Sequence, residues 1–426
     1  MELGRALAAV VVALAVGQGG QVHAAPAQHA VVLENPSDRT PDLVRDDRVR
    51  FPAVYALEQA GTTVYAGGEF ATLEDATRTT SYARSDLAAF DARTGAVSRT
   101  FAPRVDGSVW AVRAYGSSIY VGGTFSTVDG VARRGVAKLD ATTGRVDPAF
   151  RATTVRGDVT DLRVVQGRLV VAGQFAKRLA ALDLATGADT GYLDLGITGT
   201  ADGLSRPTRV YRFAVTPDQS RLLAIGDVGS VSGQPRARAF MVDLGPARGT
   251  LSPWYYPGLT RGCSGSKLPA YLRDVDFSPD GSWFVLVATG GIPRRDGHGV
   301  AVCDGAARFE TRTVHPQRPT WMNYTGGDTL HSVAVTGAAV YVSGHQRWLD
   351  NPYGNDSCGQ GCVPRPGIGA IDPVTGKALP WNPGKTRGVG GKDLLATSEG
   401  LWVGSDGARF DGEYHYGIAF APLPAR

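Results

Sequence analysis

An internal repeat, complete in residues 109–150, constrains this chain more than any other feature. Within it, apolar residues alternate with polar or small ones in short runs that read VWAV, IYVGG and GVAKLD. Turn residues separate the runs at residues 115–118 (YGSS), at Asp129-Gly130 and at residues 140–144 (DATTG). Period-two alternation interrupted by such turns predicts a four-stranded antiparallel sheet whose last strand covers about residues 145–150.

One such sheet cannot form a domain alone, because both of its faces are apolar and its edges are unpaired. Copies of the pattern begin at Val54, Val109, Val159, Val210, Leu272, Leu330 and Gly391. The first four starts are 55, 50 and 51 residues apart, close to the roughly 40–50 residues of a propeller blade. We therefore predict an all-β, seven-bladed β-propeller with its blades over about residues 51–422.

The last copy has three strands, which leaves one edge of the ring open. Residues 29–34 (HAVVLE) form a β-prone run near the amino terminus. We expect this run to pair with residues 418–421 and complete the last blade, because pairing removes the open edge. A second domain needs about 100 residues outside the repeats, so residues 25–426 are predicted to form a single domain.

The first 24 residues have the pattern of a signal peptide: Arg5, then the apolar run LAAVVVALAV, then Val22-His23-Ala24. The run is too short for a membrane span, so we expect a secreted, extracellular protein without one. Charged residues make up 20% of the chain, with a net charge of +4 and both signs interspersed. This pattern indicates no nucleic-acid partner, and we expect a monomer.

Four cysteines in an exported chain predict two disulfides. Cys358 and Cys362 lie in one glycine-rich loop and are expected to pair, which leaves Cys263 for Cys303. A zinc site is the alternative, but no histidines are suitably placed beside these cysteines.

The repeat consensus is YVGGxF, then GxxRxxxAxLDaxTG, then a closing Phe or Trp-Asn-Pro, clearest in residues 120–150 and 371–383. It resembles the delta-60-type repeat of secreted, mostly actinobacterial β-propeller proteins. The resemblance covers most of the chain but implies little about activity, since propellers carry many unrelated functions.

The first strand of each blade starts at the rim to which the second strand returns, so both ends share one face. Near that rim the first strands align at Ala56, Ala111, Asp161, Arg212, Asp274, Ser332 and Asp393. One place earlier stand Tyr55, Trp110, Thr160, Tyr211, Arg273, His331 and Lys392. The simpler interpretation is that such side chains bond between blades; the functional one is a polar binding site at the channel mouth, with Asp161, Arg212, Asp274, His331 and His345 as contributors.

Long connections at this rim, such as residues 314–327 and 345–367, add a second set of candidates, because ordered loops on a rigid scaffold often carry binding. Aromatic side chains there can stack on sugars. Trp254 and Trp381 occupy a repeat position and are expected in the core. The aromatics without a repeat counterpart are therefore the predicted ligand contacts: Trp321, Tyr324, Trp348 and Tyr353.

No GxSxG, HExxH or phosphate-binding glycine loop is present in the sequence. We expect no cofactor; an acidic loop with Asp406, Asp411 and Glu413 is a weak calcium candidate that lacks EF-hand spacing. The leading hypothesis is a non-catalytic extracellular scaffold that binds a glycan or an exported protein. The alternative is a secreted polysaccharide hydrolase or lyase with acid and base residues at the channel mouth.

Overall fold

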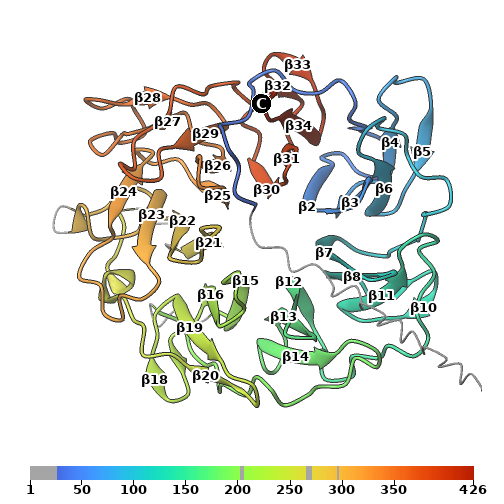
Figure 1. Ribbon diagram of the computed structural model, residues 1–426, viewed down its shortest axis with the longest axis horizontal. Helices are drawn as coiled ribbons and strands as arrows, with labels where there is room; N and C mark the ends of the chain where they lie inside the picture. Colours follow the sequence, from blue (N-terminus) through green and yellow to red (C-terminus); the bar gives the residue numbers. More distant parts are fainter. Residues whose placement is uncertain (1–25, 202–205, 265–270, 295–296) are drawn as a thin grey trace, which may run out of the picture.

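Seven antiparallel sheets surround a central axis in the computed structural model, which describes residues 26–201, 206–264, 271–294 and 297–426 (Figure 1). The innermost strand of each sheet contacts that of the next sheet in chain order, and the seventh contacts the first. The ring is therefore closed, which confirms the predicted seven-bladed β-propeller.

The blades follow one another along the chain. Blade 1 consists of β2 (Ala53–Ala60), β3 (Thr63–Glu69) and β6 (Leu87–Asp91). Blade 2 consists of β7 (Val109–Tyr115), β8 (Ser118–Gly123) and β11 (Val136–Asp140). Blade 3 consists of β12 (Asp158–Val165), β13 (Arg168–Gln174) and β14 (Leu179–Asp183). Blades 4 and 5 comprise β15 (Arg209–Val215), β16 (Arg221–Asp227), β19 (Ala239–Leu244) and β20 (Gly249–Leu251); and β21 (Tyr271–Phe277), β22 (Trp283–Thr289), β23 (Gly305–Glu310) and β24 (Trp321–Tyr324). Blades 6 and 7 comprise β25 (Leu330–Val335), β26 (Val340–Gly344) and β29 (Ile368–Ile371); and β30 (Gly391–Ala396), β31 (Gly400–Ser405) and β34 (Ile418–Pro422).

Five blades carry a short hairpin between their second and third strands. These hairpins are β4 (Thr72–Glu74) with β5 (Ser81–Ala83), β9 (Thr127–Val128) with β10 (Val131–Ala132), β17 (Ser230–Val231) with β18 (Gln234–Pro235), β27 (Trp348–Leu349) with β28 (Val363–Pro364), and β32 (Arg409–Phe410) with β33 (Glu413–Tyr414). The 3-10 helix η1 (Pro257–Thr260) lies before blade 5.

The predicted fourth strand is reduced in most blades. In blade 2 it is a single bridge between Leu139 and Val146. The repeat arginine replaces the missing ladder: Arg133 donates to the carbonyls of Ala132 (2.7 Å) and Asp147 (3.0 Å). The same two-carbonyl arrangement recurs at Arg84, Arg236 and Arg365. The consensus arginine therefore holds the outer edge of the blade.

The Asp-x-x-Thr-Gly corners are hydrogen-bonded turns, as expected. Asp140 Oδ1 accepts from the N–H groups of Thr142 (3.1 Å) and Thr143 (2.7 Å) and from the Thr143 hydroxyl (2.8 Å). Gly144 then turns the chain with φ of 73°, a backbone conformation that favours glycine. Asp91, Asp183 and Asp372 make the same three bonds.

In blades 1, 2 and 6 an aromatic pair ties the edge segment of the blade to its second strand. Tyr120 and Phe150 pack edge to face with ring centroids 5.6 Å apart, a geometry that adds about 0.5–1.5 kcal/mol to simple burial. Tyr341 and Trp381 form the corresponding pair in blade 6. Trp254 and Trp381 are 0% and 6% exposed, so the prediction that they belong to the core is confirmed.

The amino-terminal segment closes the ring where it was expected, although not as a regular strand. Leu33 N–H donates to Pro422 O (2.8 Å) and Ser37 N–H donates to Phe420 O (2.8 Å), while Val32 is buried beside β34. Beyond it, β1 (Asp42–Leu43) pairs with β4 of blade 1. The segment therefore joins blade 7 to blade 1, the two ends of the chain.

Both predicted disulfides are present, Cys263 with Cys303 and Cys358 with Cys362. The first links the segment before blade 5 to the connection between β22 and β23. The described residues include no helix long and apolar enough to cross a membrane.

Candidate functional site

Each of the seven innermost strands contains a β-bulge near the same end. The ladder register skips one residue there, for example between Val109 and Ala111 opposite Gly123 and Gly122. The skipped residues are Tyr55, Trp110, Thr160, Tyr211, Arg273, His331 and Lys392. We call them the bulge ring. A bulge redirects a side chain that the regular pleat would send elsewhere, and bulges are frequent beside binding sites.

Glycines of the second strands stand opposite the bulges in all blades except blade 5. Opposite the bulge in blade 2, a Cβ placed on Gly123 would lie 2.0 Å from Ser108 O. Gly68 and Gly173 stand equally close to the carbonyls of Ala53 and Asp158. The second glycine of the YVGG motif is therefore required by the close backbone approach that a bulge creates.

All seven bulge-ring residues line one cavity of about 220 Å³ at the mouth of the central channel, together with Tyr271, Leu272 and Arg212. The lining is divided by blade. Blades 1 to 4 contribute three aromatic rings and a threonine, and blades 5 to 7 contribute an arginine, a histidine and a lysine. The cavity therefore has an aromatic side and a basic side.

Hydroxyl groups on the aromatic side donate their hydrogens into the protein. Tyr55 Oη donates to Glu69 Oε2 (3.2 Å), and Tyr211 Oη donates to Asp227 Oδ2 (2.5 Å). Thr160 Oγ1 donates to Val210 O (2.7 Å). Burial, reinforced by the neighbouring carboxylates, raises the pKa of both tyrosines, so their hydroxyls stay protonated.

On the basic side, Arg273 is held by two neighbours. Its Nε donates to His331 Nδ1 (3.0 Å) and its Nη1 donates to Tyr271 Oη (2.8 Å). Because Nδ1 accepts, the proton of neutral His331 is on Nε2. Burial and the adjacent Arg273 lower the pKa of His331 to about 2, so the imidazole is neutral and acts as an acceptor for Arg273.

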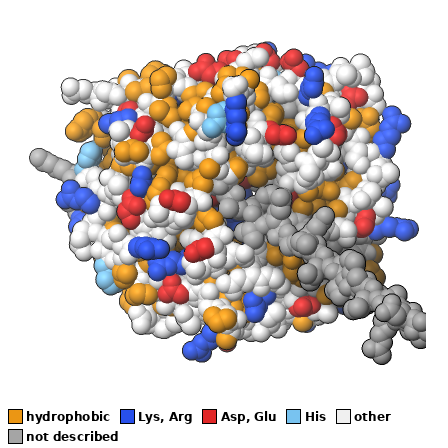
Figure 2. Space-filling view, viewed as in Figure 1, with side chains coloured by type: hydrophobic (Ala, Val, Ile, Leu, Met, Phe, Trp, Pro, Cys, Tyr) orange, Lys and Arg blue, Asp and Glu red, His pale blue; other side chains and the backbone are white. Residues whose placement is uncertain are grey.

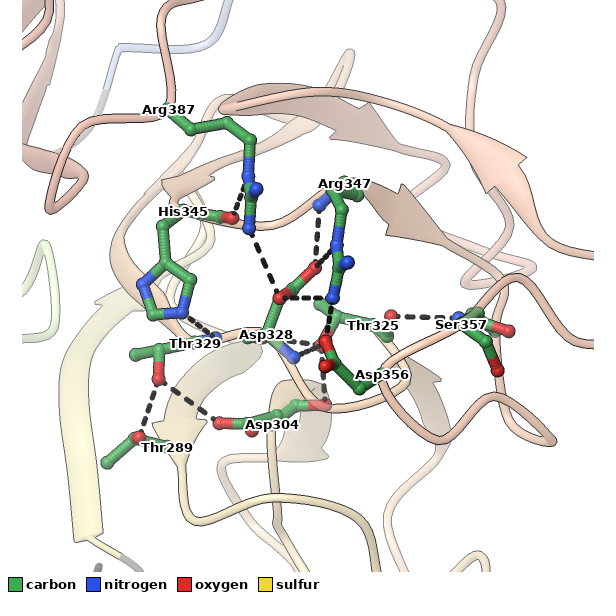
Figure 3. Close-up of polar contacts among 11 residues, drawn as sticks. Thr289, Asp304, Thr325, Asp328, Thr329, His345, Arg347, Asp356, Ser357 and Arg387 are labelled. Carbon is green, nitrogen blue, oxygen red and sulfur yellow. Dashed lines mark hydrogen bonds and ion pairs between the residues drawn. The ribbon is translucent and has the colours of Figure 1, made fainter.

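A polar network centred on Asp328 includes His345 (Figure 3). The ring centroid of His345 lies 5.8 Å from that of His331. Thr329 N–H donates to His345 Nε2 (3.3 Å), and Arg387 Nε donates to His345 O (2.6 Å). Arg387 and Arg347 both bond Asp328, at 3.3 and 2.9 Å. Figure 3 shows that this network braces His345 from the loops of blade 6.

Asp304 is the second buried carboxylate of this network. It accepts from Gly291 N–H (2.8 Å) and from the Thr329 hydroxyl (3.3 Å), and burial raises its pKa to about 7. Its place next to Cys303 joins the disulfide-linked connection of blade 5 to the loop that precedes blade 6.

One residue further along the innermost strands, the side chains face the channel below the mouth. Asp161 accepts from its neighbour Leu162 and from Phe213 N–H of blade 4 (2.9 Å each). Asp274 likewise accepts from Val275 (2.9 Å) and from Val333 of blade 6 (3.0 Å). These two predicted site residues thus make the bonds between blades that the simpler interpretation describes. Burial raises the pKa of Asp274 to about 7, although Arg212 opposes the shift.

Arg212 lies between the mouth and the channel and lines both cavities. Its guanidinium reaches across the axis, with contacts to Trp110 O (3.5 Å) and Tyr55 O (3.4 Å) on blades 2 and 1. Both contacts are long for hydrogen bonds. Arg212 is therefore the floor of the mouth cavity.

The predicted aromatic contacts on the loops are divided by the structure. Trp321 and Tyr324 lie in β24 and are 8% and 4% exposed, with bonds from Trp321 Nε1 to Pro373 O and from Tyr324 Oη to Ala301 O. The expectation that these two are exposed is wrong, because the segment forms the outer strand of blade 5. Trp348 is half-buried under Arg347. Tyr353 is 70% exposed and stacks on His298.

The acidic loop of blade 7 does not gather into a metal site. Asp406 accepts from Val389 and Gly390 N–H groups, and Glu413 pairs with His415 at 3.5 Å. Within the described part of the chain, no group of three or more His, Cys, Asp or Glu side chains is arranged to hold a metal ion.

Sequence reasoning singled out only His331 and Arg212 among the residues that line the mouth cavity. The aligned positions one place earlier in the repeat contained the rest of the bulge ring. The missing signal was the glycine that stands opposite the bulge in every blade except blade 5, where Ala288 and Val287 take its place. Outside the mouth, Figure 2 shows basic and acidic side chains interspersed over the face in view, without an area of one charge.

Comparisons with known proteins support the fold alone. No family model matches the chain, and no curated protein matches it. Among solved structures, the WD40 repeats of RRP9 align with a TM-score of 0.54 and 10% identity, over 92% of this chain and 100% of that one. The computationally designed Ika8 protein aligns with a TM-score of 0.48 and 13% identity, over 90% and 98%.

Proposed function

We propose that this protein is a secreted, non-catalytic binding module whose ligand, a glycan, enters the mouth cavity. One observation carries the proposal: seven bulge residues, one from each blade, line the same cavity. Four of them are aromatic or hydroxylated, as sugar-binding surfaces require.

Secretion is supported by the signal-peptide pattern of residues 1–24 and fits a chain with two disulfides. The YVGGxF and LDaxTG consensus further supports kinship with secreted propellers of the delta-60-type repeat. The protein acts as a monomer in this proposal, with the mouth open to solvent.

The titratable groups of the cavity favour binding over acid–base catalysis. A good general acid or base has a pKa close to the working pH. His331 has a pKa near 2, and the pKa values of Tyr55 and Tyr211 are raised above their ordinary value. Asp274, which has a pKa near 7, lies in the channel below this cavity and uses both oxygens to accept backbone N–H groups. A hydrolase or lyase therefore remains the alternative rather than the proposal.

A glycan array probed with the purified protein tests the proposal, with hits measured by calorimetry and their products analysed by chromatography. We expect retention without product. Trp110→Ala should weaken binding about 10-fold or more, because it removes a stacking surface from the mouth.

Trp348→Ala is the matched control, since it removes a half-buried indole from a loop outside the cavity. It should bind as the wild type does. If this variant lost binding and Trp110→Ala did not, the binding site would lie on the loops rather than in the mouth cavity. Turnover of a hit would establish the enzyme alternative, and no retained glycan would contradict the proposal.

A further inference from the structure

The basic side of the mouth contains cations with no carboxylate in direct contact. Within the ranges that the structure describes, Arg212, Arg273 and Lys392 make no ion pair, although Arg212 interacts over a longer distance with Asp274 and Asp393, and Lys392 with Asp406. Other cations of the channel and its surroundings are paired, such as Arg113 with Glu58 (2.7 Å) and Arg347 with Asp328 (2.9 Å). Since partly buried charges are normally paired, the lack of a carboxylate in contact with these cations makes the mouth a candidate site for an anion.

Arg273 is preorganised for such an anion. His331 Nδ1 accepts from its Nε and Nη2, and Tyr271 Oη accepts from its Nη1. Its guanidinium lies 5.0 Å from the centre of the Tyr271 ring. A guanidinium has five N–H donors in a planar fork that matches an oxyanion. Two N–H donors, one on each of Nη1 and Nη2, therefore remain for a ligand.

The opposite side of the cavity offers acceptors. The hydroxyls of Tyr55, Tyr211 and Thr160 donate their only hydrogen to protein oxygens. Their own oxygens can then only accept from a ligand. A ligand group on this side must bring donors, as the hydroxyls of a sugar ring do, while its ring packs on the aromatic faces.

The cavity limits the size of the ligand. Its volume of about 220 Å³ is below the roughly 300–1,000 Å³ of sites for drug-sized ligands. Arg212 closes the floor toward the channel. The space therefore suits one ring and its substituents rather than an extended chain.

Building on the proposed glycan-binding role, we propose that the mouth recognises a single sugar unit that carries an oxyanion, with the anion at Arg273 and Lys392 and the ring hydroxyls at Tyr55, Tyr211 and Thr160. A carboxylate, a sulfate or a phosphate has the required chemistry. The uronic acids, whose carboxylate is planar, match the fork of Arg273 best.

Matched sugars test this charge requirement. Calorimetry would compare the methyl glucuronide with the methyl glucoside, and the galacturonide with the galactoside, so that each pair differs only in the carboxylate. Glucose 6-sulfate and glucose 6-phosphate distinguish the source of the oxyanion. We expect an acidic sugar to bind about 10-fold or more tightly than its neutral partner, and the preference to weaken with added salt.

Lysine variants test which residue causes the preference for an acidic sugar. Lys392→Met should abolish the preference for the acidic sugar, whereas Lys392→Arg should retain it. Lys377→Met is the control, because it removes the same charge from an exposed lysine of blade 6 outside the cavity. Thermal melting of each variant verifies that it is folded.

The outcomes separate this inference from the proposed function. If neutral and acidic sugars bind equally, the mouth still binds glycans but the oxyanion requirement is overturned. Equal losses in Lys392→Met and Lys377→Met would also overturn it, because net charge would then explain the preference. If no sugar binds in either series, both the inference and the glycan-binding role fail.

Discussion

Two rings of side chains lie one residue apart around the axis of this protein, and their polar groups have different fates. The bulge ring lines the mouth with cations that no carboxylate of the described chain pairs. The next residues inward, the channel ring, include Asp161, Asp274 and Asp393, which accept N–H groups of the following blade. Side chains at the residue that the ladder skips therefore face the mouth cavity, where a ligand can reach them. Side chains at the next residue, where the ladder resumes, form hydrogen bonds between neighbouring blades.

The largest expected effect is at the channel wall. Glu58 is 0% exposed, pairs with Arg113 at 2.7 Å and accepts from Ala114 N–H at 3.0 Å. Glu58→Ala should lower the free energy of unfolding by about 3–5 kcal/mol, because it removes the only carboxylate in direct contact with the buried guanidinium of Arg113 in the described part of the chain. Urea denaturation measures the loss. Glu58→Gln, which keeps an acceptor, should lose less, and equal losses would contradict the role of the charge pair.

Asp274 in the channel should make stability fall as pH rises. Its pKa is about 7 in the folded state and about 4 when unfolded. The folded state therefore holds the proton more tightly, and the stabilisation present at low pH disappears between about pH 4 and 7. As pH rises through this window, the free energy of unfolding of Asp274→Asn should increase relative to that of the wild type by on the order of 2–4 kcal/mol. A difference that does not vary with pH in urea titrations would refute this.

His331 in the bulge ring should show the opposite dependence. Its folded pKa of about 2 lies below the unfolded value of about 6.5, so its contribution is lost as pH falls below about 6.5. Gln in its place keeps an acceptor for Arg273 and does not titrate. His331→Gln should therefore be more stable than wild type by about 1–2 kcal/mol at pH 5 relative to their difference at pH 8. Identical melting shifts at both values would argue against a neutral, buried imidazole.

The smallest effect should follow removal of a bulge-ring cation. Burial lowers the pKa of Lys392, so its charge adds little to the fold. Lys392→Met should change the free energy of unfolding by less than about 1 kcal/mol, as measured by thermal melting. A loss comparable to that of Glu58→Ala would erase the distinction between the two rings.

The blade pattern, the ring closure, the disulfide pairs and the core position of Trp254 were all predictable. The blade pattern and the core position of Trp254 depend on alternation, turn residues and repeat position, which a single repeat contains. The ring closure followed from the missing strand of the last blade, and the disulfide pairs followed from the spacing of four cysteines. The exposure of Trp321 and Tyr324 was predicted wrongly, because β24 pairs with β23 although no repeat position marks it as a strand. Tertiary pairing decided the burial of those side chains.

What the sequence by itself determined is the number of blades and which residues occupy equivalent positions in them, because apolar period and turn chemistry are local properties of about 50 residues. The bulge at one of these positions was seen only in the structure. Only the tertiary structure decided that Tyr55, Trp110, Arg273 and Lys392 share one cavity and that Asp161 and Asp274 do not contribute free carboxylates to it. The physical reason is register. A one-residue skip reverses which side chain faces the mouth. The seven side chains come together around the axis only when all seven blades are in place.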